Sequence, residues 1–326
     1  MKISVDGGAL NPKNGERFGT AIFSENLVKA LHLYDKKNIY HVYTFQNLKP
    51  KLFWMKGRIS LEELKNKSNI FLALNQALPI YTSGKIISFC HGLSYHFHPQ
   101  HYPAKDVVRL NKQLKEMIKR SDIIIVSSEK VKQELVSINR LARRSLDEGV
   151  LIIDKIHVEP FGIPLDMLDT VTTLIRPYSS CNSKYKYFLF VGMNHSIKNI
   201  DFIKQAFNEF KKDKKFEDYI LYIITENISR KKLKKLYQNA KALLTASHYE
   251  SFNFPILEAL SQGCPVIGLK TAIIPEFEAY VNLANNIEEF VEKMKKITVK
   301  PSVQLINRLY KKFNWKDYVN NLVKLY

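Results

Sequence analysis

Two glutamates, Glu250 and Glu258, flank the start of a predicted helix in the second half of this sequence. The helix begins near Pro255, a residue favoured in the first helical turn, and ends at Gly263. Its first turn would offer free N–H groups and a positive dipole end, which suit a phosphate. The two carboxylates would accept hydrogen bonds from hydroxyl groups such as those of a sugar or a ribose. The alternative interpretation is structural, with both acids complementing the helix dipole at the surface.

The elements that would position these residues follow one pattern along the chain. Short apolar runs rich in Ile and Val alternate with segments of helical periodicity, which predicts βαβ units and parallel sheets. In the first half, the predicted strands are 2–5, 39–45, 70–73, 86–90, 123–127 and 156–158, and the predicted helices are 22–32, 61–66, 106–120 and 130–141. In the second half, the predicted strands are 187–191, 219–225, 242–245 and 265–268, and the predicted helices are 200–211, 230–238, 255–262, 287–297 and 303–326. Two parallel-sheet domains of this kind place ligands at the carboxyl ends of their strands.

The charge, the cysteines and the apolar runs limit the class of protein. The chain has 50 Lys and Arg against 31 Asp and Glu, a net charge of +19, which suits nucleic acid, an anionic membrane face or an anionic small substrate. The lysine clusters at 211–215 and 231–235 are interpreted as solvated helix faces. The three cysteines form no Cys-x-x-Cys motif and fit a reducing cytosol. No apolar run reaches the roughly 18 residues of a membrane span, so we expect a cytoplasmic protein.

Several short motifs occur along the chain in a fixed order. They are His91-Gly-Leu-Ser-Tyr, the segments 122–132 and 155–163, the strand at 187–191 followed by Ile197-Lys198-Asn199, the segment with Glu250 and Glu258, then Pro275-Glu276 and Phe313-Asn-Trp315. Together they resemble the motifs of the family 4 retaining glycosyltransferases, and of their mannosyltransferase-like group in particular. The two glutamates correspond to the Glu-x7-Glu signature of that family. The resemblance covers most of the chain.

The resemblance implies an α/β protein with the GT-B fold, in which two Rossmann-like parallel-sheet domains face each other across a cleft. It assigns 1–165 to an acceptor-side domain, 166–186 to a linker and 187–302 to a donor domain. The remaining residues, 303–326, would form a C-terminal helix that packs back toward the first domain. The donor domain is expected to be shortened, because the chain runs almost directly from the strand at 219–225 to the helix at 230–238.

The resemblance also implies the reaction and its partners. A sugar would move from a nucleotide-sugar, GDP-mannose or a UDP-sugar, to a hydroxyl group of a glycan, lipid-linked or protein-linked acceptor, with retention and without metal or another cofactor. Nucleic acid is not an expected partner. An anionic membrane surface is a further candidate, contacted at its inner face through the basic helix at 106–120.

Roles for single residues follow from the same resemblance. The predicted catalytic residues are His91, which would bond a sugar hydroxyl or the phosphate, and Glu250, which would accept from a sugar hydroxyl. The predicted donor-binding residues are Gly19, Thr20, Lys198, Asn253, Phe254, Pro255, Ile256 and Glu258. Lys198 and backbone N–H groups of Gly19, of Thr20 and of the turn from Asn253 to Ile256 would hold the diphosphate. Glu258 would accept from the ribose. The leaving phosphate itself would take the acceptor proton, so no protein nucleophile is required.

Departures from the family pattern keep other hypotheses open. Ile197 replaces an arginine, and Ser251 and Asn253 replace glycines. A catalytically degenerate GT-B protein that binds a nucleotide or glycan without turnover would fit these changes. A nucleic-acid-binding protein is motivated only by the net charge and lacks a recognisable module. The histidines between 91 and 101 are too irregularly spaced for a metal site.

Overall fold

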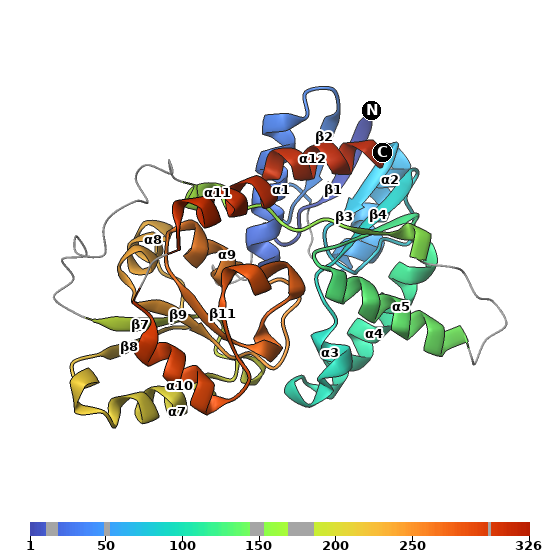
Figure 1. Cartoon of the computed structure of the whole chain (residues 1–326). Helices are drawn as coiled ribbons and strands as arrows, with labels where there is room; N and C mark the ends of the chain where they lie inside the picture. The colour runs from blue at the N-terminus through green and yellow to red at the C-terminus, as the bar shows by residue number, and fades with distance from the viewer. Residues whose placement is uncertain (11–18, 49–52, 144–152, 169–185, 299–300) are drawn as a thin grey trace. The chain divides into compact units, whose positions relative to one another are not determined.

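The computed structural model describes residues 1–10, 19–48, 53–143, 153–168, 186–298 and 301–326 (Figure 1). They form two compact units, one made of Met1–Phe161 with Trp315–Tyr326 and the other of Gly162–Asn314. Each unit contains one sheet in which all paired strands are parallel. The prediction of two parallel-sheet domains is therefore confirmed.

The first unit is built on a six-stranded sheet in the order β2-β1-β3-β4-β5-β6. Its strands are β1 (Lys2–Asp6), β2 (Ile39–Tyr43), β3 (Ile70–Ala73), β4 (Lys85–Cys90), β5 (Ile123–Val126) and β6 (Ile156–Val158). Its helices and helical turns are α1 (Gly19–Tyr34), η2 (Trp54–Ile59), α2 (Ser60–Lys65), α3 (Ser94–Phe97), η3 (Pro99–His101), α4 (Ala104–Arg120), α5 (Glu129–Arg143), η4 (Ile153–Lys155) and α12 (Trp315–Lys324). The strands β3 and β5 are buried along their whole length, because helices cover both faces of a parallel sheet.

The second unit is built on a five-stranded sheet in the order β11-β10-β9-β7-β8. Its strands are β7 (Tyr187–Val191), β8 (Ile220–Ile224), β9 (Ala242–Thr245), β10 (Val266–Leu269) and β11 (Asn282–Ala284). Its helices and helical turns are η5 (Leu165–Met167), η7 (Ser196–Lys198), α7 (Ile200–Lys211), η8 (Lys214–Phe216), α8 (Arg230–Asn239), α9 (Phe254–Ser261), η9 (Lys270–Ala272), η10 (Pro275–Tyr280), α10 (Ile287–Lys296) and α11 (Val303–Lys312). The chain passes from β8 to α8 through residues 225–229 alone, so this unit is shortened as predicted.

The single helix predicted over 303–326 is wrong, because the chain breaks between α11 and α12. Phe313 is fully buried in the second unit, 5.2 Å from the ring of Phe277. Trp315, two residues later, is buried in the first unit, 6.0 Å from the ring of Phe23 on α1. Two aromatic anchors that belong to different cores cannot share one continuous helix, so only α12 returns to the first unit.

The chain crosses between the units at Phe161–Gly162 and again at Asn314–Trp315. The first crossing lies a few residues before the boundary expected at 165. Ile163 N–H donates to the carbonyl of Phe313 at 3.0 Å, which joins the two crossing segments. Of the predicted linker 166–186, residues 166–168 belong to the second unit, and 169–185 lie outside the described residues.

Candidate functional site

Lys198 and Glu250, two of the predicted site residues, form an ion pair in the second unit. Lys198 Nζ donates to Glu250 Oε1 at 2.6 Å, and Ser247 Oγ donates to the same oxygen at 2.7 Å. The Lys198 side chain is 19% exposed and that of Glu250 is 9% exposed, so the pair lies at the border between protein and solvent. Within the described part of the chain, Lys198 Nζ has this one partner. Two of its three N–H groups are therefore available to a ligand oxygen.

The loops after two neighbouring strands bring this pair together. β7 and β9 are paired in parallel, so the loops that follow them leave the sheet at the same end, the carboxyl end of the strands. Lys198 ends the turn η7, and Asn199 then adopts φ 51°, a left-handed conformation that asparagine tolerates better than most residues. His248 N–H donates to the carbonyl of Ile197 at 2.9 Å and ties the two loops to each other.

Asn253 shapes the start of α9. It has φ 71° and ψ 73°, and its Nδ2 donates to Thr245 Oγ1 at 3.3 Å. The replacement of a family glycine by Asn253 thus preserves a backbone conformation that glycine favours. Pro255 has no N–H, and Ile256 N–H already donates to the carbonyl of Asn253 at 3.1 Å. Neither Pro255 nor Ile256 therefore has an unused N–H group for the predicted diphosphate contact. The Phe254 side chain is buried in the core.

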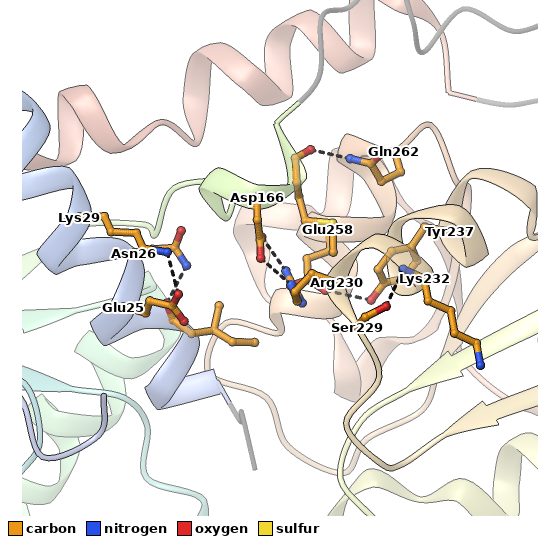
Figure 2. A network of polar contacts seen from close by, with 12 residues as sticks. Glu25, Asn26, Lys29, Asp166, Ser229, Arg230, Lys232, Tyr237, Glu258 and Gln262 are labelled. Carbon is orange, nitrogen blue, oxygen red and sulfur yellow. Dashed lines mark hydrogen bonds and ion pairs between the residues drawn. The ribbon is translucent and has the colours of Figure 1, made fainter. Parts of the chain in front are cut away.

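Glu258 lies in a second polar network, which Figure 2 shows. Its side chain is 2% exposed. Its Oε1 accepts from Arg230 Nη2 at 2.7 Å, and its Oε2 accepts from Tyr237 Oη at 3.1 Å. Arg230 also donates to both carboxylate oxygens of Asp166, from Nε at 2.8 Å and from Nη2 at 3.0 Å. The network joins three separate segments, because Asp166 lies on η5, Arg230 and Tyr237 on α8, and Glu258 on α9.

The electrostatics of this network are dominated by burial. Burial raises the pKa of Glu258, and the charge of Arg230 opposes that shift. Burial by itself would lower the pKa of Arg230, but the carboxylates of Glu258 and Asp166 raise it above its ordinary value. Arg230 is therefore a permanent cation held between two acids.

Sequence reasoning missed Arg230, Tyr237 and Asp166. The lysines of the same helix that were interpreted as solvated, such as Lys231 and Lys232, are indeed exposed, whereas Arg230 is not. One signal was present: Arg230 directly follows Ser229, whose Oγ caps the helix by accepting from Lys232 N–H at 3.3 Å. A cation is unfavourable in the first turn of a helix, but Lys231 and Lys232 occupy the same turn, so this signal does not single out Arg230.

The remaining predicted residues, His91, Gly19 and Thr20, lie in the first unit. His91 follows β4, and its Nε2 lies 2.6 Å from the carbonyl oxygen of Leu74. A carbonyl only accepts, so Nε2 carries the proton. Burial lowers the pKa of His91 to about 4, so the ring is neutral at pH 7 and Nδ1 is an acceptor. This state fits a sugar hydroxyl and not a phosphate. Gly19 and Thr20 are the first two residues of α1, and residues 11–18 before them lie outside the described residues.

Other polar residues lie with His91 at the carboxyl ends of the strands of the first sheet, although no motif pointed to them. Asp6 ends β1 and is fully buried, and its carboxylate accepts from Gly8 N–H at 3.0 Å and from Asn75 Nδ2 at 3.2 Å. Burial raises the pKa of Asp6 to about 6. Gln76, the next residue along, accepts from Tyr95 Oη at 2.8 Å. This cluster lies at the carboxyl end of the sheet, where ligands of α/β proteins bind.

The described residues show neither a metal-binding cluster nor a membrane-spanning helix. They contain no group of three or more His, Cys, Asp or Glu side chains that could hold a metal ion. Of the histidines near 91–101, His96 pairs with Asn111 at 2.7 Å. None of the described helices combines the length and the apolar composition that crossing a membrane requires.

Comparison with solved structures identifies the architecture. A sucrose-phosphate synthase from Thermosynechococcus elongatus superposes with a TM-score of 0.67 at 14% identity, covering 100% of this chain and 98% of that one. A UDP-forming trehalose-phosphate synthase from Burkholderia vietnamiensis superposes with a TM-score of 0.67 at 9% identity, covering 99% and 98%. The fold is GT-B. The predicted GT-B architecture is therefore confirmed, and at these identities the likeness shows the fold alone.

Sequence comparison finds a family-model match for part of the chain and two relatives. Residues 222–312, which contain Arg230, Glu250 and Glu258, match the family model for glycosyl transferases group 1. A probable sucrose-phosphate synthase of Thermosipho melanesiensis is 28% identical over 253 residues, covering 64% of this chain and 56% of the relative. O-antigen chain mannosyltransferase B of Escherichia coli is 24% identical over 234 residues, covering 64% and 59%. The chain spans less than two thirds of either relative.

Proposed function

We propose that this protein is a retaining hexosyltransferase that moves a sugar from a nucleotide-sugar to a hydroxyl group of a glycan or glycoconjugate, without a metal ion. The observation that carries the proposal is the pair formed by Lys198 and Glu250, whose charged atoms lie 2.6 Å apart at the carboxyl edge of the second sheet. Glu250 belongs to the segment that matches the glycosyl transferases group 1 model. The pair presents a cation suited to a diphosphate beside an acceptor suited to a sugar hydroxyl.

The chemistry needs few protein groups. The bond between the anomeric carbon and the phosphate oxygen breaks, and its electron pair leaves with the nucleoside diphosphate. The acceptor oxygen bonds the anomeric carbon on the same face, and its proton passes to the leaving phosphate. Lys198 stabilises the charge that develops on the diphosphate. Glu250, held by Lys198 and Ser247, orients the sugar by accepting from one of its hydroxyl groups.

The test is turnover with a panel of donors. GDP-mannose, UDP-glucose and other UDP-, ADP- and dTDP-sugars are offered with glycan, lipid-linked and sugar-phosphate acceptors, and release of the nucleoside diphosphate is measured. Glu250→Ala should lower the rate with the preferred donor about 100- to 1,000-fold, the range for loss of one transition-state contact. Glu288→Ala, which removes an exposed acid at the start of α10, is the matched control and should leave the rate unchanged.

The outcomes separate the hypotheses. Turnover that depends on Glu250 and not on Glu288 supports the proposal. Tight binding of a nucleoside diphosphate in calorimetry, without turnover of any donor, would instead show the degenerate binding protein. Turnover that survives Glu250→Ala would remove the role given to that residue.

We further infer that α4 binds an anionic membrane surface and that the acceptor lies at this surface. Val108 and the cations Lys105, Arg109, Lys112, Lys115 and Lys119 form its exposed face at helical spacing. Both acids of this helix are paired: Asp106 with Arg109 of this face, and Glu116 with Arg120 and Lys56. Within the described residues, the four lysines have no ion-pair partner. The opposite face, with Leu114 and Met117, packs in the core of the unit, so the face left for a surface consists of these cations and Val108.

Vesicle sedimentation tests this contact. Lys112→Gln, Lys115→Gln and Lys119→Gln together should weaken binding to phosphatidylglycerol-containing vesicles about 150-fold, from about 1 kcal/mol per cation. The matched control replaces Lys231, Lys232 and Lys235, three exposed lysines of α8, and changes the net charge equally. An equal loss in both variants, or a preference for RNA over vesicles with the same dependence on α4, would contradict the inference. Binding should also fall steeply with added salt.

A further inference from the structure

We propose that Arg230 contacts the nucleoside part of the donor, at an oxygen of its base or ribose, and that Glu258 and Asp166 are positioning residues that hold its guanidinium. This inference rests on the proposed function. It gives Arg230 the contact that the family resemblance assigns to Glu258.

The exposure of the network shows which member can meet a ligand. The side chain of Glu258 is 2% exposed, that of Arg230 is 20% exposed and that of Asp166 is 42% exposed. Both oxygens of Glu258 already accept hydrogen bonds inside the protein. A ligand outside the unit therefore reaches the guanidinium before it reaches the carboxylate of Glu258.

The guanidinium has donors left for such a ligand. Its three hydrogen bonds to Asp166 and Glu258 all come from Nε and Nη2. Within the described part of the chain, the two N–H groups of Nη1 have no partner. A fork held by two carboxylates is fixed in direction, so these two donors are presented without further loss of side-chain freedom.

The charge of the network selects the kind of acceptor. One guanidinium and two carboxylates carry a net charge of about −1 when Glu258 is ionised. A phosphate would be repelled by that charge, whereas a base carbonyl or a ribose oxygen would accept from Nη1 without repulsion. Lys198, paired with a single acid, is the better phosphate ligand.

The topology places the two cations in the loops after neighbouring parallel strands. β7 and β8 are paired in parallel up to Val191 and Ile224, and Gly192 N–H donates to the carbonyl of Ile224 at 3.1 Å. Lys198 follows β7 and Arg230 follows β8, so both leave the same edge of the sheet. A nucleoside diphosphate lying along that edge meets Lys198 with its diphosphate and Arg230 with its nucleoside.

The experiment compares two ligands by calorimetry on the full chain. UDP and GDP are titrated first, and the nucleotide that binds more tightly is then compared with inorganic diphosphate. Arg230→Lys keeps the charge but loses the fork, and should weaken nucleotide binding about 10- to 100-fold. Its affinity for inorganic diphosphate should not change. Asp166→Asn, which leaves Arg230 and Glu258 in place, should weaken nucleotide binding about 3- to 10-fold, again without effect on diphosphate.

Controls make the result decisive. Arg308→Gln removes an exposed arginine from α11 and should affect neither ligand. Lys198→Met should weaken both ligands. An unchanged nucleotide affinity in both Arg230→Lys and Asp166→Asn would overturn the inference, as would an equal loss for the two ligands. A wild-type protein that binds no nucleotide would overturn the proposed function as well, so the two failures are distinguishable. Thermal unfolding of each variant checks that it is folded.

Discussion

Replacing Glu258 by glutamine and by alanine separates the charge of this side chain from its shape. Glutamine can keep both partners: its oxygen accepts from Arg230 Nη2, which lies 2.7 Å from Oε1, and its N–H donates to Tyr237 Oη, which lies 3.1 Å from Oε2. Burial raises the pKa of Glu258, so ionisation of this carboxyl costs more here than in water, and a neutral amide avoids that cost. We therefore expect Glu258→Gln to change the free energy of unfolding by less than about 1 kcal/mol.

Alanine at the same position removes both acceptors. The Tyr237 hydroxyl is then left buried without this partner, while Arg230 keeps its fork to Asp166. Removal of one member of a buried ion pair costs about 3–5 kcal/mol. Since Arg230 retains one carboxylate, the lower end applies, and we expect Glu258→Ala to lower the free energy of unfolding by about 3 kcal/mol.

The assay is urea denaturation followed by far-UV circular dichroism. Both tryptophans, Trp54 and Trp315, lie in the first unit, so their fluorescence reports on the unit that does not contain Glu258. Glu288→Gln, at an exposed position of α10, is the control. A loss in Glu258→Gln as large as that in Glu258→Ala would refute the reasoning, because the charge would then outweigh the hydrogen-bond geometry.

The pH dependence of the same comparison gives a second readout. The pKa of Glu258 is raised in the folded protein, so the folded state binds the proton more tightly than the unfolded chain does. The stability that this proton contributes is present below the unfolded pKa and is lost as pH rises through the folded pKa. The wild type should therefore lose stability relative to Glu258→Gln as the pH rises above the pKa of an unfolded glutamate, about 4.3, and through the raised pKa of the folded state. A difference that grows in the wild type's favour over this range would contradict the assignment.

Three further predictions concern other residues. Lys198→Met should raise the Kd for inorganic diphosphate about tenfold or more in calorimetry, because an ammonium aimed at the phosphate is lost; an unchanged Kd would exclude that contact. Asn253→Gly should leave the free energy of unfolding within about 0.5 kcal/mol of the wild type, whereas Asn253→Val should cost about 2 kcal/mol, because φ is 71° and a branched side chain strains a left-handed backbone. The pKa of Asp6 is raised from 3.8 to about 6, so the wild type should lose about 3 kcal/mol relative to Asp6→Asn as pH rises through 6. Tryptophan fluorescence during urea denaturation measures this loss, and parallel pH profiles would contradict it.

The strands of both sheets could be predicted because each is a short apolar run that is visible in the local sequence. Runs such as Ile123–Val126 are apolar without interruption, and every predicted strand of both units is found within two residues of its place. The strand β11 (Asn282–Ala284) was missed because three residues beside two asparagines carry no period to detect. The break between α11 and α12 was missed although Phe313 and Trp315, two residues apart, cannot lie on one helix face. Which core an aromatic side chain enters is a property of the tertiary structure.

In the candidate site, too, the local sequence indicated the two glutamates but not the partners that distinguish them. Spacing in the sequence makes Glu250 and Glu258 look equivalent, since both flank the start of one helix. The structure separates them through partners that are distant in the chain: Lys198 lies 52 residues before Glu250, and Arg230 lies 28 residues before Glu258. The link from Arg230 to Asp166 spans 64 residues. Local spacing carries no record of such pairings, so the fold has to supply them.

The departures from the family pattern make sense as a set once these partners are known. Ile197, which stands where the family has an arginine, is buried, and its carbonyl fixes the loop that carries His248. This backbone hydrogen bond helps to hold the loop of Lys198, whichever side chain stands at position 197. The cation lost there is matched by Arg230, which leaves the same edge of the sheet after the neighbouring strand. Because two acids surround Arg230 and Ile197 is uncharged, a diphosphate bound beside Lys198 would meet less positive charge than with an arginine at 197. Binding of the donor should therefore depend more on its nucleoside, and less on its phosphates, than an arginine at 197 would make it.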